Sequence, residues 1–278
     1  DDDSVVAVER LTMGATDLDV FAGLAVDGEP SLGFQLSGVE LALAIHTDKA
    51  DATRSWTTLE AEAASAAFIG VPGLRVEAET LALAINRAAT DGSLIDFAAM
   101  PLEVATGPSD TRTISLSADK GETLRASGNL AVDLFGFVQL SGSFAFDKTE
   151  QEVTLVDGTI VETELLALGG DDVSAFVGIN GPADSGYAMG FGLTGVDFAL
   201  GLFSGEIDGN AVSWTSLQAT AGDFGLVGLP GLEVSGGPLA VELNRFHGTV
   251  AGRDADDLVI DYSVTDLEIA TGPTTSFT

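Results

Sequence analysis

The stretch GFQLSGVELALAI at residues 33–45 decides the fold class, because its large and small residues alternate with a period of two. Val39, Leu41, Leu43 and Ile45 alternate with a glutamate and two alanines. Successive side chains of a β-strand point to opposite faces, whereas those of a helix repeat about every 3.6 residues. This stretch therefore predicts a strand with large residues on one face and small residues on the other.

The same alternation appears at residues 81–85, 130–134 and 138–146, and Asp-Gly or Pro-Gly turn sequences separate such runs. The segment LEAEAASAA at 59–67 is an exception, because its intrinsic helix propensity is high. A similar segment at 217–225 has two glycines where this one has alanines, and two glycines cost a helix about 2 kcal/mol. We therefore expect residues 59–67 to form a strand as well.

An internal duplication underlies this comparison, and its blocks recur in the same order along the chain. The matching blocks are 11–21 with 166–176, 33–39 with 190–196, 55–56 with 213–214, 70–74 with 228–232, 86–87 with 244–245, and 102–108 with 267–273. The spacing changes only between blocks, which places the insertions in loops and the blocks in packed elements.

The duplication predicts a repeat unit of roughly 155 to 165 residues. Residues 1–160 are expected to form a first complete unit and residues 161–278 a second, truncated unit, in a slice of a longer array. The predicted fold is an all-β, mainly antiparallel, elongated repeat rod of stacked sheets, solenoid-like or β-groove in form. The small Ala and Gly residues fit either sheets packed closely on both sides or an apolar groove.

Composition narrows the possible partners. The chain has 43 acidic and 11 basic residues, a formal net charge of −32 and no cysteine. This charge argues against nucleic acid, whose phosphates need clustered Lys and Arg. The longest uncharged apolar stretch, 134–146, is well short of the ~20 residues of a spanning helix, so no transmembrane segment is expected. The acidic composition fits an exported, salt-tolerant or cation-binding surface.

Catalytic signatures are weak. The sequence GFGLTG at 190–195 satisfies GxGxxG, but a dinucleotide site needs this motif between a strand and a helix, and here it lies among predicted strands. His46 and His247 are the only histidines, Phe203 and Ala89 take their equivalent positions, and both are expected at the surface. The chain is therefore not expected to be an enzyme, although a carboxylate pair of the glycosidase type stays open.

Calcium is the ion that the sequence favours, because loop aspartates offer the oxygen ligands that it prefers. Asp17 and Asp172 recur at equivalent positions, and Asp254, Asp256 and Asp257 lie in an inserted loop. These five aspartates are the candidate metal ligands. None of them matches an EF-hand or GGxGxD spacing, and a solvated acidic surface is the alternative interpretation.

Two other features recur in both copies. Trp56 and Trp214 are the only tryptophans and are expected in the core, with stacking on a sugar or a partner as the alternative. The Asn-Arg pairs at 86–87 and 244–245 are expected to form internal ion pairs instead of binding an anionic ligand. The expected pairs are Arg87 with Asp96 and Arg245 with Asp261.

The matched blocks, together with GNLAVDLFGFVQLSGSFAF at 128–146 and FVGING at 176–181, resemble repeats of giant secreted bacterial surface proteins of the RTX and LEPR-XLL types. The similarity covers nearly the whole chain, and its motifs are structural, with no catalytic signature. The resemblance implies export, a secreted or cell-surface location in bacteria, and a spacer, adhesive or matrix role. Such families can carry an Asp-rich calcium loop after Asn180-Gly181, where this chain has PADSG.

These observations lead us to expect a non-catalytic structural or spacer module of an adhesin or extracellular-matrix type, stabilised by cations. Its partners are expected to be neighbouring repeat units of the same chain or of like chains. Two alternatives stay open: a lipid-binding module with an apolar groove, and a filament subunit that docks a strand in trans.

Overall fold

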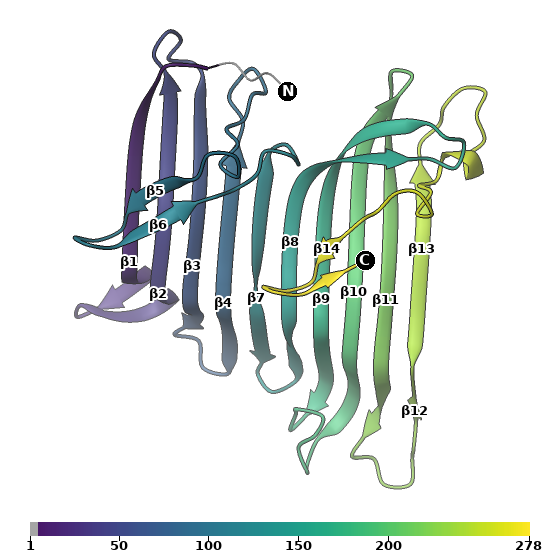
Figure 1. The fold of residues 1–278 in the computed structure, drawn as a ribbon. Helices are drawn as coiled ribbons and strands as arrows, with labels where there is room; N and C mark the ends of the chain where they lie inside the picture. The colour runs from purple at the N-terminus through teal and green to yellow at the C-terminus, as the bar shows by residue number, and fades with distance from the viewer. Residues whose placement is uncertain (1–4) are drawn as a thin grey trace.

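The computed structural model describes residues 5–278, which form one large open β-sheet and two short hairpins (Figure 1). The sheet has 11 strands in the order β1-β2-β3-β4-β7-β8-β9-β10-β11-β12, with β13 also paired to β11. Paired strands are antiparallel throughout. No α-helix occurs in the described residues, and η1 (Asp256–Leu258) is a single 3₁₀ turn. The predicted all-β, mainly antiparallel fold is confirmed.

The strands of the sheet are long, most of them between 12 and 20 residues. Their bounds are β1 (Val8–Val26), β2 (Glu29–Asp48), β3 (Ser55–Ile69), β4 (Leu74–Arg87), β7 (Thr123–Leu134), β8 (Val138–Thr154), β9 (Ile160–Ile179), β10 (Met189–Ile207), β11 (Asn210–Val227), β12 (Ser235–Gly236) and β13 (Leu239–His247). The segment 59–67 lies within β3, so the strand prediction for it is correct.

Two hairpins lie across the same face of the sheet (Figure 1). The first joins β5 (Leu102–Ala105) to β6 (Thr111–Ile114) and contacts β1, β2 and β3. The second joins β14 (Ile269–Ala270) to β15 (Ser276–Phe277) and contacts β8, β9 and β10 through β14. We call the face under the hairpins the front face and the opposite one the back face. Because side chains alternate, Ala42 and Ala44 of β2 point to the front and Leu41 and Leu43 to the back.

Equivalent glycines let each hairpin approach the sheet closely. A Cβ on Gly14 of β1 would overlap the carbonyl oxygen of Ala105, and a Cβ on Gly169 of β9 would overlap that of Ala270. Glycine is required where a backbone approaches another this closely. The duplicated Leu-x-x-Gly pattern of the two copies therefore has a packing cause.

The two core clusters lie on the front face, beneath the hairpins and the segments that lead to them. The smaller cluster holds Ala42, Ala44, Phe97, Val104 and Ile114. The larger cluster lies in the second copy and includes Leu165, Phe203, Trp214, Leu258, Ile260 and Ile269. Both tryptophans are buried, as predicted.

The two copies share one topology within one sheet. Strands β1–β4 followed by β5 and β6 correspond to strands β9, β10, β11 and β13 followed by β14 and β15. Strands β7 and β8, which have no second counterpart, pair with β4 on one side and with β9 on the other. The copies therefore form a continuous sheet, and the division into units 1–160 and 161–278 stays a prediction.

Matching bulges interrupt the strands of both copies. Asp17 and Asp172 have φ of 52° and 48°, and Gly38 and Gly195 on the neighbouring strands have φ of 61° and 60°. The register shifts beside Asp17 and Asp172, as at a β-bulge. Aspartate tolerates the left-handed region better than most residues, so the backbone accounts for the recurrence of this residue type.

Candidate functional site

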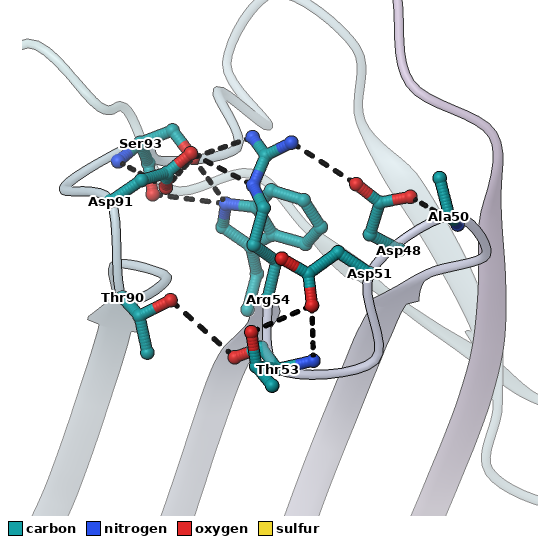
Figure 2. A network of polar contacts seen from close by, with 9 residues as sticks. Asp48, Ala50, Asp51, Thr53, Arg54, Thr90, Asp91 and Ser93 are labelled. Carbon is teal, nitrogen blue, oxygen red and sulfur yellow. Dashed lines mark hydrogen bonds and ion pairs between the residues drawn. The ribbon is translucent and has the colours of Figure 1, made fainter.

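A network of charged and hydroxyl side chains lies at one end of the first copy (Figure 2). Arg54, at the end of the β2–β3 loop, forms ion pairs with Asp48 at 3.0 Å and with Asp91 at 2.8 Å. Its guanidinium group also lies 5.1 Å from the centre of the Trp56 ring. Two carboxylates and an aromatic face therefore satisfy this cation, so it holds the loops together and is not free to bind an anionic substrate.

The two loops of this network are shaped by aspartate turns. Asp51 accepts hydrogen bonds from the backbone N–H and the hydroxyl of Thr53, at 3.0 and 2.7 Å. Asp91 likewise accepts hydrogen bonds from the backbone N–H and the hydroxyl of Ser93, at 3.2 and 2.6 Å. In each case the hydroxyl donor, followed by the backbone donor, lowers the pKa of the carboxyl below its ordinary value. These carboxylates are ionised turn residues, not general acids.

The recurring tryptophan attaches the crossover segment to the sheet in each copy. We use crossover segment for residues 88–101 in the first copy and 248–268 in the second, which connect the sheet to each hairpin. Trp56 Nε1 donates to the carbonyl of Ser93 at 2.9 Å, and Trp214 Nε1 donates to that of Leu258 at 2.7 Å. Each tryptophan is therefore a structural lock, because its one polar atom bonds to the backbone that it packs against.

The recurring asparagine makes a second, parallel lock. Asn86 Nδ2 donates to the carbonyl of Ile95 at 3.1 Å, and Asn244 Nδ2 donates to that of Ile260 at 2.7 Å. On β3 and β11 a hydroxyl donates to the amide oxygen, from Thr58 at 3.1 Å in the first copy and from the equivalent serine at 3.5 Å in the second. These bonds tie a strand, its neighbour and the crossover segment together.

The arginines of the Asn-Arg pairs do not make the predicted ion pairs. Within residues 5–278 neither Arg87 nor Arg245 forms a salt bridge, and both are exposed. Asp96 accepts instead from the N–H of Ala98 at 3.0 Å, and Asp261 from that of Ser263 at 2.9 Å. The reason is strand alternation: each asparagine points to the front, where its crossover segment lies, so the next residue points to the back.

The prediction that both histidines lie at the surface is wrong for His46. His46 is 7% exposed and lies on the front face, with its ring 5.9 Å from that of Phe97. Burial, and then the charge of Arg10, lower its pKa below the ordinary value, so the neutral imidazole is favoured. The equivalent residue Phe203 is also buried, and this apolar replacement was the available sequence signal. The other histidine, His247, is exposed at the end of β13, as predicted.

The structure does not bring the candidate metal ligands together. Asp17 and Asp172 lie in separate bulges, whereas Asp254, Asp256 and Asp257 are exposed around η1. The described part of the chain contains no group of three or more His, Cys, Asp or Glu residues arranged to hold a metal ion. Calcium binding by these aspartates stays a prediction. The GxGxxG sequence at 190–195 lies inside strand β10, as the strand interpretation requires.

The back face of the sheet is not covered by any other part of residues 5–278. A hollow of about 460 Å³ opens on it over β3, β4 and β7. Small residues form its floor, among them Ala61, Ala63, Ala126 and Gly128. Larger residues form its walls, among them Leu36, Leu81, Leu83, Phe144, Phe146 and Leu168. The sequence left open whether small residues meant close packing or a groove, and here they line a groove.

Searches of protein-family models, curated proteins and solved structures find no match for this chain. Across residues 5–278 the structure also holds no helix with the length and apolar character needed to cross a membrane.

Proposed function

We propose that this chain is a non-catalytic structural module of a large repetitive secreted or cell-surface protein. The observation that carries the proposal is that one construction, a hairpin locked over a set of strands by Trp and Asn, occurs twice in a single continuous sheet. The Trp and Asn residues that recur between the copies make structural contacts, and their side-chain nitrogens are engaged in hydrogen bonds to the crossover segments.

The way in which the copies are joined supports a spacer role. Strands β7 and β8 carry the hydrogen-bonded ladder from β4 to β9 without a flexible linker. With neighbouring strands about 4.8 Å apart, each added strand lengthens the module by that amount without a hinge. Units of this kind transmit stability to their neighbours, as in other repeat proteins.

The edges of the sheet offer places for further units. Strand β1 pairs only with β2, and β13 pairs only with β11, within the described residues. Unpaired edge strands are templates for pairing with another strand, from the same chain or from a like chain. The net charge of −32 makes neighbouring modules repel one another at low salt, so added cations are stabilising.

Breaking the ladder between the copies tests the proposal. Ala145 lies buried in the middle of β8, so Ala145→Pro removes a ladder hydrogen bond at the junction. We expect wild-type chain to unfold in one transition in urea, and the variant to show two transitions with faster hydrogen exchange in β7 to β9.

A control is Gln151→Ala near the end of the same strand, where the side chain donates a hydrogen bond to the carbonyl of Glu152 and the ladder is left intact. This variant should unfold like wild type. Two separate transitions in wild-type protein would show that the copies are independent and would overturn the spacer proposal.

A further inference from the structure

The back face carries an uninterrupted row of apolar side chains across the sheet. We call it the apolar row; strand register places its members directly opposite one another from β1 to β13. Its members are Ala15, Leu41, Ala61, Leu83, Ala126, Phe146, Leu168, Leu200, Leu217 and Leu243. A row of this kind needs a matching register in every strand, so it is a property of the whole sheet.

The rows beside it are also free of charge over most of their length. Phe144, Gly170, Phe198 and Ala219 follow on one side. Leu43, Leu59, Ile85 and Leu124 follow on the other side, on which Lys148 and Arg245 mark the beginning of a charged rim. The acidic residues of the chain therefore lie on the front face, in loops and at the rims, and leave the back face apolar.

This face is exposed in the single chain. Leu168 and Leu243 are 39% and 43% exposed, and Leu11 and Met13 on β1 are 64% and 55% exposed. Three rows across ten strands span about 900 Å² of the sheet, at strand spacings of about 4.8 Å and row spacings of about 7 Å, with Lys148 and Arg245 as charged positions among them. Monomers rarely expose an apolar patch above about 600 Å², and a stable dimer needs about 800 Å² from each partner. The area is that of an interface.

The shape of the back face is complementary to the back face of a second copy of the chain. The hollow over β3, β4 and β7 has an alanine and glycine floor, and an aromatic ridge stands beside it on β8 and β10. Phe144 and Phe198 form this ridge, with ring centres 6.5 Å apart. In a two-fold pair each ridge meets the hollow of the other copy, because the same surface serves on both sides.

The charges at the rim argue against an anionic amphiphile as the occupant. Arg87 and Lys148 line a small hollow there together with Glu122, Glu150 and Glu164, so the rim has no positive excess. An acyl chain on the row would leave its headgroup without a cationic partner. Two sheets packed about 10 Å apart bury the apolar row, while the charged groups of the rim lie at the edge of the interface.

We propose that two copies of this chain pack back to back through the apolar row to form a two-layer sandwich. The hairpins then cover both outer faces, and the acidic residues remain at the surface. The pairing rests on the back face alone and holds whether or not the chain acts as a spacer. Salt strengthens the pair, because it screens the repulsion between two chains of charge −32.

The test is the oligomeric state of the full chain by sedimentation equilibrium, with the double variant Leu168→Glu/Leu200→Glu. We expect wild-type dimers at micromolar concentration and at least a 100-fold weaker association of the variant. The control is Val264→Glu, which adds one carboxylate at an exposed position of the front crossover segment and should leave the dimer intact. Far-ultraviolet circular dichroism and the fluorescence of the front-face tryptophans report whether each variant is folded.

A second measurement keeps the proposal testable if the charged variant does not fold. The chain has no cysteine, so Leu243→Cys carries a single spin label on the apolar row. Because the ridge and the hollow set β13 of one copy over β1 of the other, nine strand spacings away, a distance of roughly 45 Å between the labels of two copies is the expected result. A wild-type monomer, a monomer carrying an acyl lipid in native mass spectrometry, or a dimer unaffected by the double variant would each overturn back-to-back pairing. The unfolding test of the spacer role is made within one chain and is independent of these outcomes.

Discussion

In the first copy the space around the buried tryptophan is filled by Arg54, Ser93 and His46, whereas in the second copy Val212, Leu258 and Phe203 take the equivalent positions. The Trp and Asn hydrogen bonds to the crossover segment are nevertheless the same in both. An ion-pair network and an aliphatic cluster thus support one geometry. The comparison teaches that the Trp and Asn hydrogen bonds fix how the crossover segment attaches to the sheet. The residues around each tryptophan set the stability of this attachment and its response to pH and salt.

Removing the tryptophans should have the largest effect. Trp214→Ala should lower the free energy of unfolding by about 3–5 kcal/mol, because it empties the centre of the larger core cluster and leaves the Leu258 carbonyl unpaired. Trp56→Ala should cost less, because the polar groups around Trp56 can be solvated. Urea unfolding followed by circular dichroism measures both. Tyr187→Ala, at an exposed aromatic residue, is the control, and a loss from Trp214→Ala no larger than from this control would contradict the lock.

Replacing a polar residue around Trp56 by the apolar residue found around Trp214 should have the next largest effect. Arg54→Val introduces the residue type of the second copy but leaves Asp48, which is 6% exposed, without its cation. We expect a loss of about 2 kcal/mol, reduced from that of a fully buried pair because Arg54 is partly exposed. Adding Asp48→Asn should restore part of the loss in urea unfolding. Arg75→Val, at an exposed ion pair, should change stability by less than about 0.5 kcal/mol; an equal loss there would remove the distinction.

A smaller effect should appear in the dependence of stability on pH. Burial lowers the pKa of His46 in the folded chain below its ordinary 6.5. As pH falls below that value, the unfolded chain takes up a proton that the folded chain resists, so stability decreases. His46→Phe, which copies Phe203, removes this contribution. The stability difference between the variant and wild type should therefore grow from pH 7.5 to pH 5.5 in urea unfolding, and parallel pH profiles would contradict this assignment.

The smallest effect should be that of cations on the whole surface. The melting temperature should rise by a few degrees with sodium chloride or with millimolar calcium, because both reduce the repulsion among the carboxylates. The triple variant Asp254→Asn/Asp256→Asn/Asp257→Asn tests whether calcium acts through the inserted loop. A calcium response that exceeds that of sodium chloride at equal ionic strength, and is lost in the variant, would establish a site there. Insensitivity to both salts would remove the electrostatic part of the proposed role.

Strand identity was predictable because it depends on local alternation and on the comparison of two copies. The segment 59–67 shows this, since the glycines of its counterpart outweighed its helix propensity. The burial of Trp56 and Trp214 was predictable from their recurrence. In the sequence alone the recurrence of Asp17 and Asp172 favours calcium; the structure adds a positive φ at both positions, which a sequence does not display.

The partners of individual side chains were harder to predict. Arg87 and Arg245 were matched with aspartates that follow them in the chain, yet those aspartates lie in segments that cross the front face while the arginines point to the back. The lack of a recurring histidine favours a surface position for His46, although its position under Phe97 is buried. Both errors concern which face of the sheet the crossover segment covers.

By itself the sequence determined that the chain forms antiparallel strands, that it contains the same set of strands twice, and that its two tryptophans are buried. These properties follow from residue periodicity and duplication, which are local and can be read in order. The tertiary structure alone decided that both hairpins cover one face and that apolar residues of ten strands align in one row on the other. The physical reason is that alternation separates two faces within each strand, whereas only the register between strands and the path of the crossover segments determine which face is covered.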